Sequence, residues 1–96
     1  MREEVQDQYG NAVYLTDERW RHIIKGHRLL DGHRAEVLST VRSGMRKQDQ
    51  LLLGKFYYTK SFPGLFRGRF TGIKVVVRFR LQNGQPNNFI VTAYPK

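Results

Sequence analysis

The segment from residue 73 to residue 81, IKVVVRFRL, constrains the fold more than any other part of this chain. Apolar side chains occupy every odd position of the segment, whereas Lys74, Arg78 and Arg80 occupy even positions. Because successive side chains of a β-strand point to opposite faces of the sheet, the apolar set would lie on one face and the basic set on the other. This pattern predicts a strand of an antiparallel sheet that has one buried face and one face open to solvent.

The first half of the chain carries its apolar residues at helical spacing instead. Thr16 is a suitable N-cap, and acidic residues that suit the helix dipole follow it directly. One face of the expected helix carries residues at i, i+3, i+4 and i+7, namely Trp20, Ile23, Ile24 and His27. Gly26 is expected to end this helix, and a second helix is expected between a cap at Asp31 and a stop at Gly44.

The remaining segments predict strands and turns. Residues 1–11 are polar and are expected to form a loose arm that ends in a turn at Gly10-Asn11. Residues 12–15 could form a short strand or an extended lead-in to the first helix. After the helices, four stretches are typical of strands: residues 50–60, 65–71, 73–81 and 89–94. Their connections are short, and short connections force antiparallel pairing.

These elements predict an α+β fold in a single domain over residues 1–96. Two N-terminal helices would pack on one face of a roughly four-stranded antiparallel sheet and leave the other face open. Two sets of residues are each expected to share a strand face: Tyr58 with Lys60, and Ile90 with Thr92 and Tyr94. Which face each set occupies stays open at this stage, because a shift of one residue exchanges the two faces.

Charge is distributed unevenly between the two halves of the chain. The sequence has 17 basic and 8 acidic residues, a net charge of +9. Residues 1–41 hold six basic and seven acidic side chains, whereas residues 42–96 hold eleven basic side chains and one acid, Asp49. A segment this basic favours a polyanionic partner, and nucleic acid is the commonest one. An anionic membrane surface and an acidic protein are the alternatives.

The residue types disfavour several other kinds of site. The chain has no cysteine, which excludes a disulfide scaffold, a cysteine nucleophile and a thiolate zinc site. His22 and His27 do not share a helix face and have no carboxylate at ligand spacing, so no metal site is predicted. No glycine-rich phosphate loop is present, so no cofactor is predicted. Without a long apolar stretch or a secretion signal, we expect a cytoplasmic protein that makes no membrane contact.

Basic and aromatic side chains alternate along much of the second half. Guanidinium groups bind phosphate in bidentate fashion, and unpaired bases stack on aromatic rings. Single-stranded RNA is therefore an expected ligand, with four candidate contact residues: Tyr58, Arg67, Arg69 and Arg80. His27 ends the helical face and could act as a general acid or base, or could equally be a capping or half-buried core residue.

Four segments of the chain together resemble a known family. VYLTDERWRHIIKGH, FYYTK, IKVVVRFR and FIVTAYPK follow one another in this order. They are similar to small domains of the barnase–EndoU–colicin–RelE superfamily, the metal-independent ribonucleases of toxin–antitoxin pairs, polymorphic toxins and phages. The resemblance covers residues 13–95. One departure is that the usual His-Pro-Glu of the family is His27-Arg28-Leu29 in this chain.

The resemblance implies a catalytic set. His27 would be the acid–base residue, and Lys60 would be a second candidate for proton transfer. Thr92 and Tyr94 would bind the scissile phosphate, with Arg78 as a cation on the preceding strand. The family also implies that no metal and no cofactor are needed, and that the partner is an acidic antitoxin or immunity protein.

The expected function is therefore an endoribonuclease that uses the 2′-hydroxyl of RNA as its nucleophile and releases a 2′,3′-cyclic phosphate. Two alternatives stay open: a non-catalytic nucleic-acid-binding module of the same fold, and a basic protein-interaction domain. The combination of His27 with Thr92 and Tyr94 favours the enzyme, because a protein that only binds RNA has no need of a histidine at the sheet edge.

Overall fold

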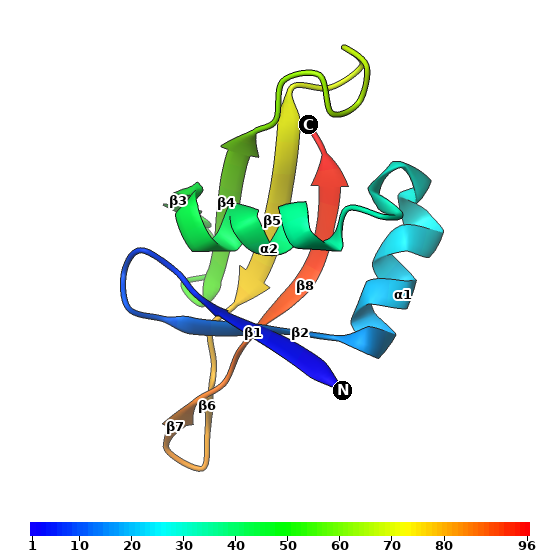
Figure 1. Cartoon of the computed structure of the whole chain (residues 1–96). Helices are drawn as coiled ribbons and strands as arrows, with labels where there is room; N and C mark the ends of the chain where they lie inside the picture. The colour runs from blue at the N-terminus through cyan, green and yellow to red at the C-terminus, as the bar shows by residue number, and fades with distance from the viewer.

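The computed structural model describes all 96 residues, as two α-helices and one main sheet with a small extra hairpin (Figure 1). The helices are α1 (Asp17–Gly26) and α2 (Arg34–Ser43), with a 3-10 turn, η1 (Arg28–Leu30), between them. The strands are β1 (Arg2–Gln6), β2 (Ala12–Thr16), β3 (Met45–Gln48), β4 (Lys55–Ser61), β5 (Gly72–Arg78), β6 (Leu81–Gln82), β7 (Gln85–Pro86) and β8 (Asn88–Pro95). The predicted α+β class is confirmed.

The main sheet has six strands in the order β1-β2-β8-β5-β4-β3, so the prediction of roughly four strands is wrong. Its neighbouring strands pair antiparallel except β2 and β8, which pair in parallel. The chain passes through both helices and five strands, β3 to β7, before β8 returns beside β2. A connection of this length permits a parallel pair. β6 and β7 form the separate hairpin, which extends away from the main sheet in Figure 1.

Strand β1 stands where a loose arm was predicted for residues 1–11. All five residues of β1 pair with β2, and Val5 is buried in the core. The turn that joins the two strands is held by Asp7, whose carboxylate accepts hydrogen bonds from the backbone N–H groups of Tyr9 and Asn11. The arm is ordered because one apolar residue and one buried carboxylate fix it at both the strand and the turn.

Helix α1 begins and ends where the sequence predicts. The N–H of Arg19 donates to the Thr16 hydroxyl at 3.0 Å, and the helix ends at Gly26. Trp20 and Ile23 are its buried residues. Neither α1 nor α2 has the length and apolar character that crossing a membrane requires.

Helix α2 begins at Arg34, later than the predicted cap at Asp31. The η1 turn occupies the preceding residues, and Gly32 then adopts a φ of +86°, a left-handed conformation that cannot continue a helix. Gly44 ends α2 as predicted. A Cβ on Gly44 would lie 2.7 Å from the carbonyl oxygen of Thr59, so glycine lets the helix end pack closely on β4.

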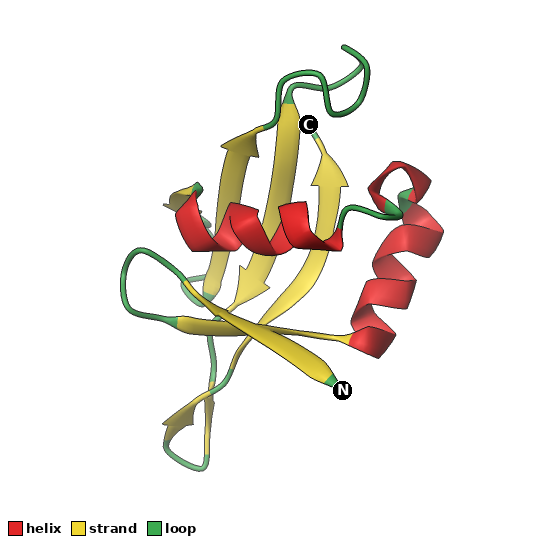
Figure 2. Cartoon of the chain, in the orientation of Figure 1, coloured by secondary structure: helices red, strands yellow, loops and turns green.

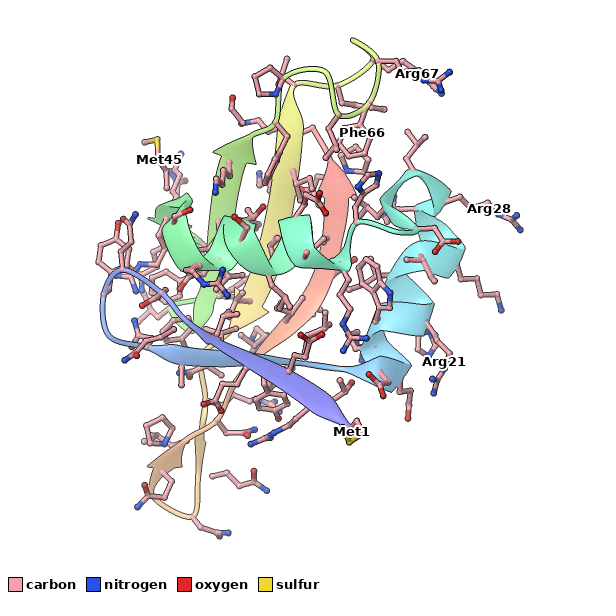
Figure 3. The ribbon with its side chains drawn as sticks, in the orientation of Figure 1. Met1, Arg21, Arg28, Met45, Phe66 and Arg67 are labelled. Atoms are coloured by element: carbon pink, nitrogen blue, oxygen red, sulfur yellow. The ribbon has the colours of Figure 1, made fainter.

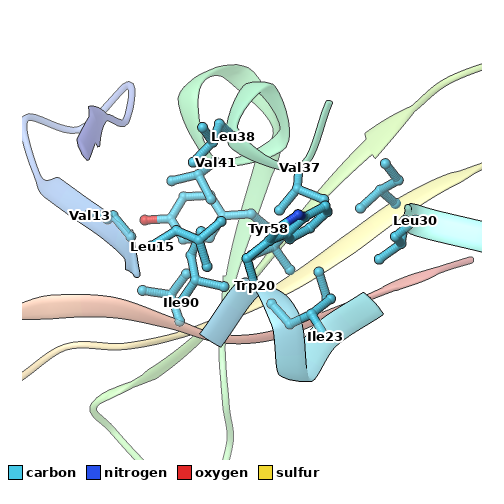
Figure 4. Packing of buried hydrophobic residues seen from close by; sticks show 14 of the residues in the cluster. Val13, Leu15, Trp20, Ile23, Leu30, Val37, Leu38, Val41, Tyr58 and Ile90 are labelled. Atoms are coloured by element: carbon cyan, nitrogen blue, oxygen red, sulfur yellow. The ribbon is translucent and has the colours of Figure 1, made fainter. Parts of the chain in front are cut away.

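The core lies between the two helices, the β1–β2 hairpin and one face of the sheet. Helix α2 crosses β4 and β5, whereas α1 lies beside β8 (Figure 2). Figure 4 shows Tyr58 of β4 meeting Leu15 of β2, Val41 of α2 and Ile90 of β8 in this layer. All four side chains are at most 1% exposed. The opposite face of the sheet carries no helix and is called the open face below.

Residues 65–71, predicted as a strand, form a loop instead. Two residues of this range, Arg67 and Gly68, have positive φ, and so does Gly64 directly before it. Residues in the left-handed conformation cannot continue a strand. The alternating aromatic and basic residues here therefore do not lie on the two faces of a sheet. Phe66 is 5% exposed and anchors the loop on the core.

Strand β5 confirms the alternation of the 73–81 segment but ends at Arg78. Ile73, Val75 and Val77 belong to the core cluster. The residues between them therefore point to the open face. The short strand β3 was not predicted, because its sequence, MRKQ, has no apolar alternation.

A β-bulge in β8 decides which of its side chains share a face. Val76 pairs with Thr92, whereas the next residue, Val77, pairs with Ile90, so Val91 is an extra residue in β8. Ile90 is consequently buried in the core, while Thr92 lies opposite Val76 on the open face. The prediction that Ile90, Thr92 and Tyr94 share one face is therefore wrong for Ile90.

The turn between β3 and β4 presents three leucines to solvent. Leu51, Leu52 and Leu53 are 90%, 48% and 75% exposed. The turn is ordered, because the Asp49 carboxylate accepts the N–H groups of Leu51 and Leu52, and the Gln48 side chain donates to the carbonyl of Leu53.

Candidate active-site groove and nucleic-acid face

The open face consists of three cross-strand rows that the strand register defines. Read from β4 through β5 to β8, the rows are Thr59–Lys74–Tyr94, Tyr57–Val76–Thr92 and Lys55–Arg78–Phe89. Each row therefore carries at least one hydroxyl, cation or aromatic ring. Val76 is only 6% exposed although no helix covers it, so the longer side chains around it shield it from solvent.

Tyr57 lies between two cations on this face. The Lys74 and Lys55 ammonium nitrogens lie 4.5 Å and 5.5 Å from the centre of its ring. Its hydroxyl donates to the Asp49 carboxylate at 2.6 Å, and this bond, with two backbone N–H donors, lowers the pKa of Asp49 to about 2. The same bond raises the pKa of Tyr57. The ring is thus fixed in place, and the one acid of the basic half is already occupied.

A groove of about 510 Å³ lies where the end of α1 meets the end of β8. Its lining residues are His27, Arg28, Leu29, Arg69, Phe70, Tyr94 and Pro95. The His27 and Tyr94 rings lie 5.9 Å apart, centre to centre, at an angle of 37°. The backbone N–H of His27 donates to the carbonyl of Ile23 at 2.8 Å, so the last turn of α1 fixes the position of this residue.

The side chains in and beside this groove have free hydrogen-bonding groups. Within the chain, no hydrogen bond or ion pair involves the side chains of His27, Arg78, Thr92 or Tyr94. Three other tyrosines, in contrast, donate their hydroxyls to side chains of the same molecule. Arg78 is notable because its Nε is buried and has no partner. The His27 imidazole and the hydroxyls of Thr92 and Tyr94 are therefore available to an external ligand, whereas the Arg78 Nε has no accessible surface.

The structure brings together part of the predicted catalytic set. His27 and Tyr94 line one groove. Thr92 lies two residues before Tyr94 on β8, in the next row of the open face, and Arg78 lies one row further along. These four residues form a continuous path from the groove across the open face.

Lys60 does not belong to this path. It pairs with Ile73, so its side chain lies on the helix-covered face, where it donates to the hydroxyls of Ser39 at 2.6 Å and Ser43 at 2.8 Å. The strand-face prediction that Lys60 accompanies Tyr58 holds, but the shared face is the one that α2 covers. Its placement in one site with His27 is therefore wrong.

Tyr58 is a core residue and cannot stack on a base, which corrects its prediction as an RNA contact. It is fully buried, and its hydroxyl donates to Asp7. Burial and this bond both raise the pKa of Tyr58. Burial acts to raise the pKa of Asp7 as well, but hydrogen bonds from Tyr58 and Asn11 outweigh it and the pKa lies below its usual range. Arg46 lies 3.8 Å from the same carboxylate.

The three remaining predicted RNA contacts occupy different places. Arg69 lines the groove beside His27. Arg80 follows β5, with its guanidinium 6.0 Å from the centre of the Phe89 ring at the third row. Arg67 lies at the exposed loop tip and points away from the sheet (Figure 3). None of the three lies on a strand, so the predicted strands over 65–71 and 73–81 are wrong at these three positions.

Sequence reasoning missed three residues that the structure places at the site: Arg28, Tyr57 and Lys74. A signal for Lys74 was present, since it shares the alternation phase of Arg78. Tyr57 could have been found only by knowing which face of the sheet each residue of β4 occupies, because a shift of one residue exchanges Tyr57 with Tyr58. No sequence signal marks Arg28, because its position depends on the turn that follows α1.

No group of three or more histidine, acidic or cysteine side chains is arranged to hold a metal ion. Comparison of the chain with protein-family models, with curated proteins and with solved structures gave no match.

Proposed function

We propose that this protein is an endoribonuclease that cleaves single-stranded RNA at the His27–Tyr94 groove without a metal ion. The observation that carries the proposal is the pairing of a histidine with a tyrosine, 5.9 Å apart, in a groove that Arg28 and Arg69 also line. These side chains form no hydrogen bonds with the rest of the protein, so they are available to substrate.

The chemistry requires only groups of this kind. The 2′-oxygen of RNA forms a bond to phosphorus while the bond from phosphorus to the 5′-oxygen breaks, which gives a 2′,3′-cyclic phosphate. A base must take the proton of the 2′-hydroxyl, and an acid must protonate the departing 5′-oxygen. His27 supplies one of these proton transfers, and the Tyr94 hydroxyl is the other candidate in the groove.

Cations are needed where negative charge builds up on the phosphorane. Arg28 and Arg69 are placed for this task, because both line the groove and neither is in an ion pair. Thr92 and Arg78 would hold the adjoining part of the strand on the open face. Lys60 has no part in this chemistry.

The proposal extends to a toxin of a toxin–antitoxin or phage-related system. A cytoplasmic ribonuclease endangers its host, so an inhibitor is needed. An acidic protein that covers the open face would serve, since opposite charge speeds association.

The test is incubation of the purified protein with single-stranded RNA in EDTA, followed by analysis of the products. We expect cleavage products that end in 2′,3′-cyclic phosphate. His27→Ala should reduce the rate about 10²–10⁴-fold while RNA affinity changes only a few-fold. His22→Ala is the matched control, because His22 is exposed on the same helix and does not line the groove.

Full activity in His27→Ala would exclude the histidine mechanism. The second candidate is a non-catalytic RNA-binding module, which the unpaired cations of the open face favour. RNA binding without any cleavage by the wild-type protein would select this second function.

A further inference from the structure

A second groove, of about 480 Å³, lies near the other edge of the sheet, where β3 and β4 meet the end of α2. We propose that this groove, called the distal groove, is a phosphate-binding site that holds the backbone of a single RNA strand whose other part occupies the His27–Tyr94 groove. This inference rests on the proposed function for the identity of the strand. The binding site itself is argued from the residues that line the groove.

The distal groove is lined by four basic side chains, three hydroxyl side chains, Gly44 and Met45, and no acidic side chain lines it. Its lining residues are Ser43, Gly44, Met45, Arg46, Lys47, Thr59, Lys60, Ser61 and Lys96. Ammonium, guanidinium and hydroxyl groups are the side chains that bind phosphate oxygens. A groove of this composition attracts anions and repels cations.

Three of its cations have no acidic partner. Lys47, Lys60 and Lys96 take part in no ion pair. Arg46 differs, because Asp7 lies 3.8 Å from it and the rings of Tyr9 and Phe56 stack on its guanidinium. Arg46 is therefore held in place as part of the wall, whereas none of the three lysines is neutralised by an acid of the chain.

Two serine hydroxyls hold the ammonium group of Lys60 in place beside the distal groove. An ammonium group has three donors, and the hydroxyls of Ser39 and Ser43 accept two of them at 2.6 Å and 2.8 Å. These bonds fix the side chain without neutralising its charge. A fixed, uncompensated ammonium beside a groove retains one donor for a phosphate oxygen.

The two grooves are joined by one row of the open face. Tyr94 lines the first groove, Lys74 pairs with Tyr94, Thr59 pairs with Lys74, and Thr59 lines the distal groove. Neighbouring strands lie about 4.8 Å apart, so Tyr94 and Thr59 are separated by about 10 Å. A single extended strand that leaves the first groove would thus cross Lys74 and reach the distal groove.

The experiment compares two uncleavable probes, a 2′-O-methyl octanucleotide with seven phosphates and a 2′-O-methyl dinucleotide with one. The dinucleotide can fill only one groove at a time, whereas the octanucleotide can reach both. Affinity is measured by fluorescence anisotropy for the octanucleotide and by NMR titration for the dinucleotide, with the Tyr94 ring as reporter of the first groove. Lys47→Gln, Lys96→Gln and their double variant remove exposed cations of the distal groove.

We expect the double variant to bind the octanucleotide about tenfold more weakly at low salt. The slope of log K against log salt should become less steep by about 1.4, because each phosphate contact on a single strand contributes about 0.7. Dinucleotide binding at Tyr94 should be unchanged. Lys25→Gln is the matched control, because Lys25 is an exposed cation on α1 that lines neither groove, and it should leave the octanucleotide slope nearly unchanged.

Three results would overturn the distal site: an unchanged octanucleotide slope in the double variant, an equal loss in Lys25→Gln, or an equal loss of dinucleotide binding at Tyr94. Absence of RNA cleavage by the wild-type protein is a separate result. It would remove the proposed enzyme and leave the distal site standing if the octanucleotide response is as expected.

Discussion

The two faces of the sheet differ in how many of their polar side chains are bonded within the molecule. On the helix-covered face, the Tyr58 hydroxyl donates to the Asp7 carboxylate, and the Arg46 guanidinium forms an ion pair with the same carboxylate at 3.8 Å. On the open face, Arg78 and Thr92 have no polar side-chain partner in the molecule. Most buried polar groups of folded proteins are satisfied, and the Arg78 Nε on the open face is an exception. The difference separates residues that stabilise the fold from residues that are available to a ligand.

The ion pairs follow the same division. Of the eleven basic residues in 42–96, only Arg46 lies in an ion pair, and its partner is Asp7. All other pairs join residues of the first 41. The ion-paired acids of the chain thus lie where the hairpin and helices pack, and ten of the eleven basic residues of the second half have no acidic partner within the chain.

The largest expected effect tests the covered face. Asp7→Ala leaves the buried Tyr58 hydroxyl without an acceptor and Arg46 without a counter-charge. We expect a loss of about 3 kcal/mol in the free energy of unfolding. Chemical denaturation measures this loss. Because Arg46 lines the distal groove and loses its counter-charge, the folded variant should bind RNA at least as tightly as the wild type. A stability equal to that of the wild type would show that the network is not needed.

A smaller effect tests the open face. Thr92→Val keeps the shape and strand propensity of the side chain and removes only a hydroxyl that makes no bond within the protein. We expect about a tenfold lower cleavage rate, equivalent to about 1.4 kcal/mol, at an unchanged melting temperature. A gel-based cleavage assay beside a thermal melt checks both. A lower melting temperature with full activity would make Thr92 a structural residue.

The next effect concerns binding alone. Lys74→Gln removes the cation in the row that joins the two grooves, with little effect on folding because Lys74 makes no ion pair. We expect about threefold weaker binding of single-stranded RNA, and a salt slope less steep by about 0.7. Anisotropy titrations at several salt concentrations measure both. An unchanged slope would place the RNA away from this row.

The smallest effect is a pH dependence of stability. The pKa of Asp49 in the fold, about 2, lies below the ordinary value of the unfolded chain, near 3.9. Its hydrogen bonds to Tyr57 and to the leucine turn therefore stabilise the fold above pH 4, and this contribution is lost as the pH falls toward 2. Asp49→Asn should reduce the pH dependence of the melting temperature in this window. If the melting temperature of the variant fell with pH as steeply as that of the wild type, the lowered pKa of Asp49 would be contradicted.

The sequence predicted correctly those features that depend on residues close together in the chain. The Thr16 cap, the stop at Gly44 and the alternation in β5 each depend on residues close together in the chain, and all three are confirmed. The loop that contains Arg67 misled the prediction, because its aromatic and basic residues alternate as a strand would. Only the positive φ angles of its turns show otherwise.

Elements that depend on distant partners could not be predicted. Strands β1 and β3 are polar edge strands, and each is stabilised by pairing with a single neighbour. The bulge at Val91 is also invisible in the sequence, although it decides that Thr92 and Ile90 point to opposite faces. Of the candidate site, the nearness of His27 to Tyr94 and Arg69 follows from the packing of α1 beside β8 and of the loop beside both.

The exposed leucines of the turn between β3 and β4 affect how the protein associates with itself in solution. Three ordered, exposed leucines would attract one another between molecules, and the net charge of +9 opposes this by mutual repulsion. A polyanion that neutralises the charge removes the repulsion and leaves the leucines exposed. Mixtures with RNA at equal charge should therefore turn cloudy, whereas an excess of either component should keep them clear.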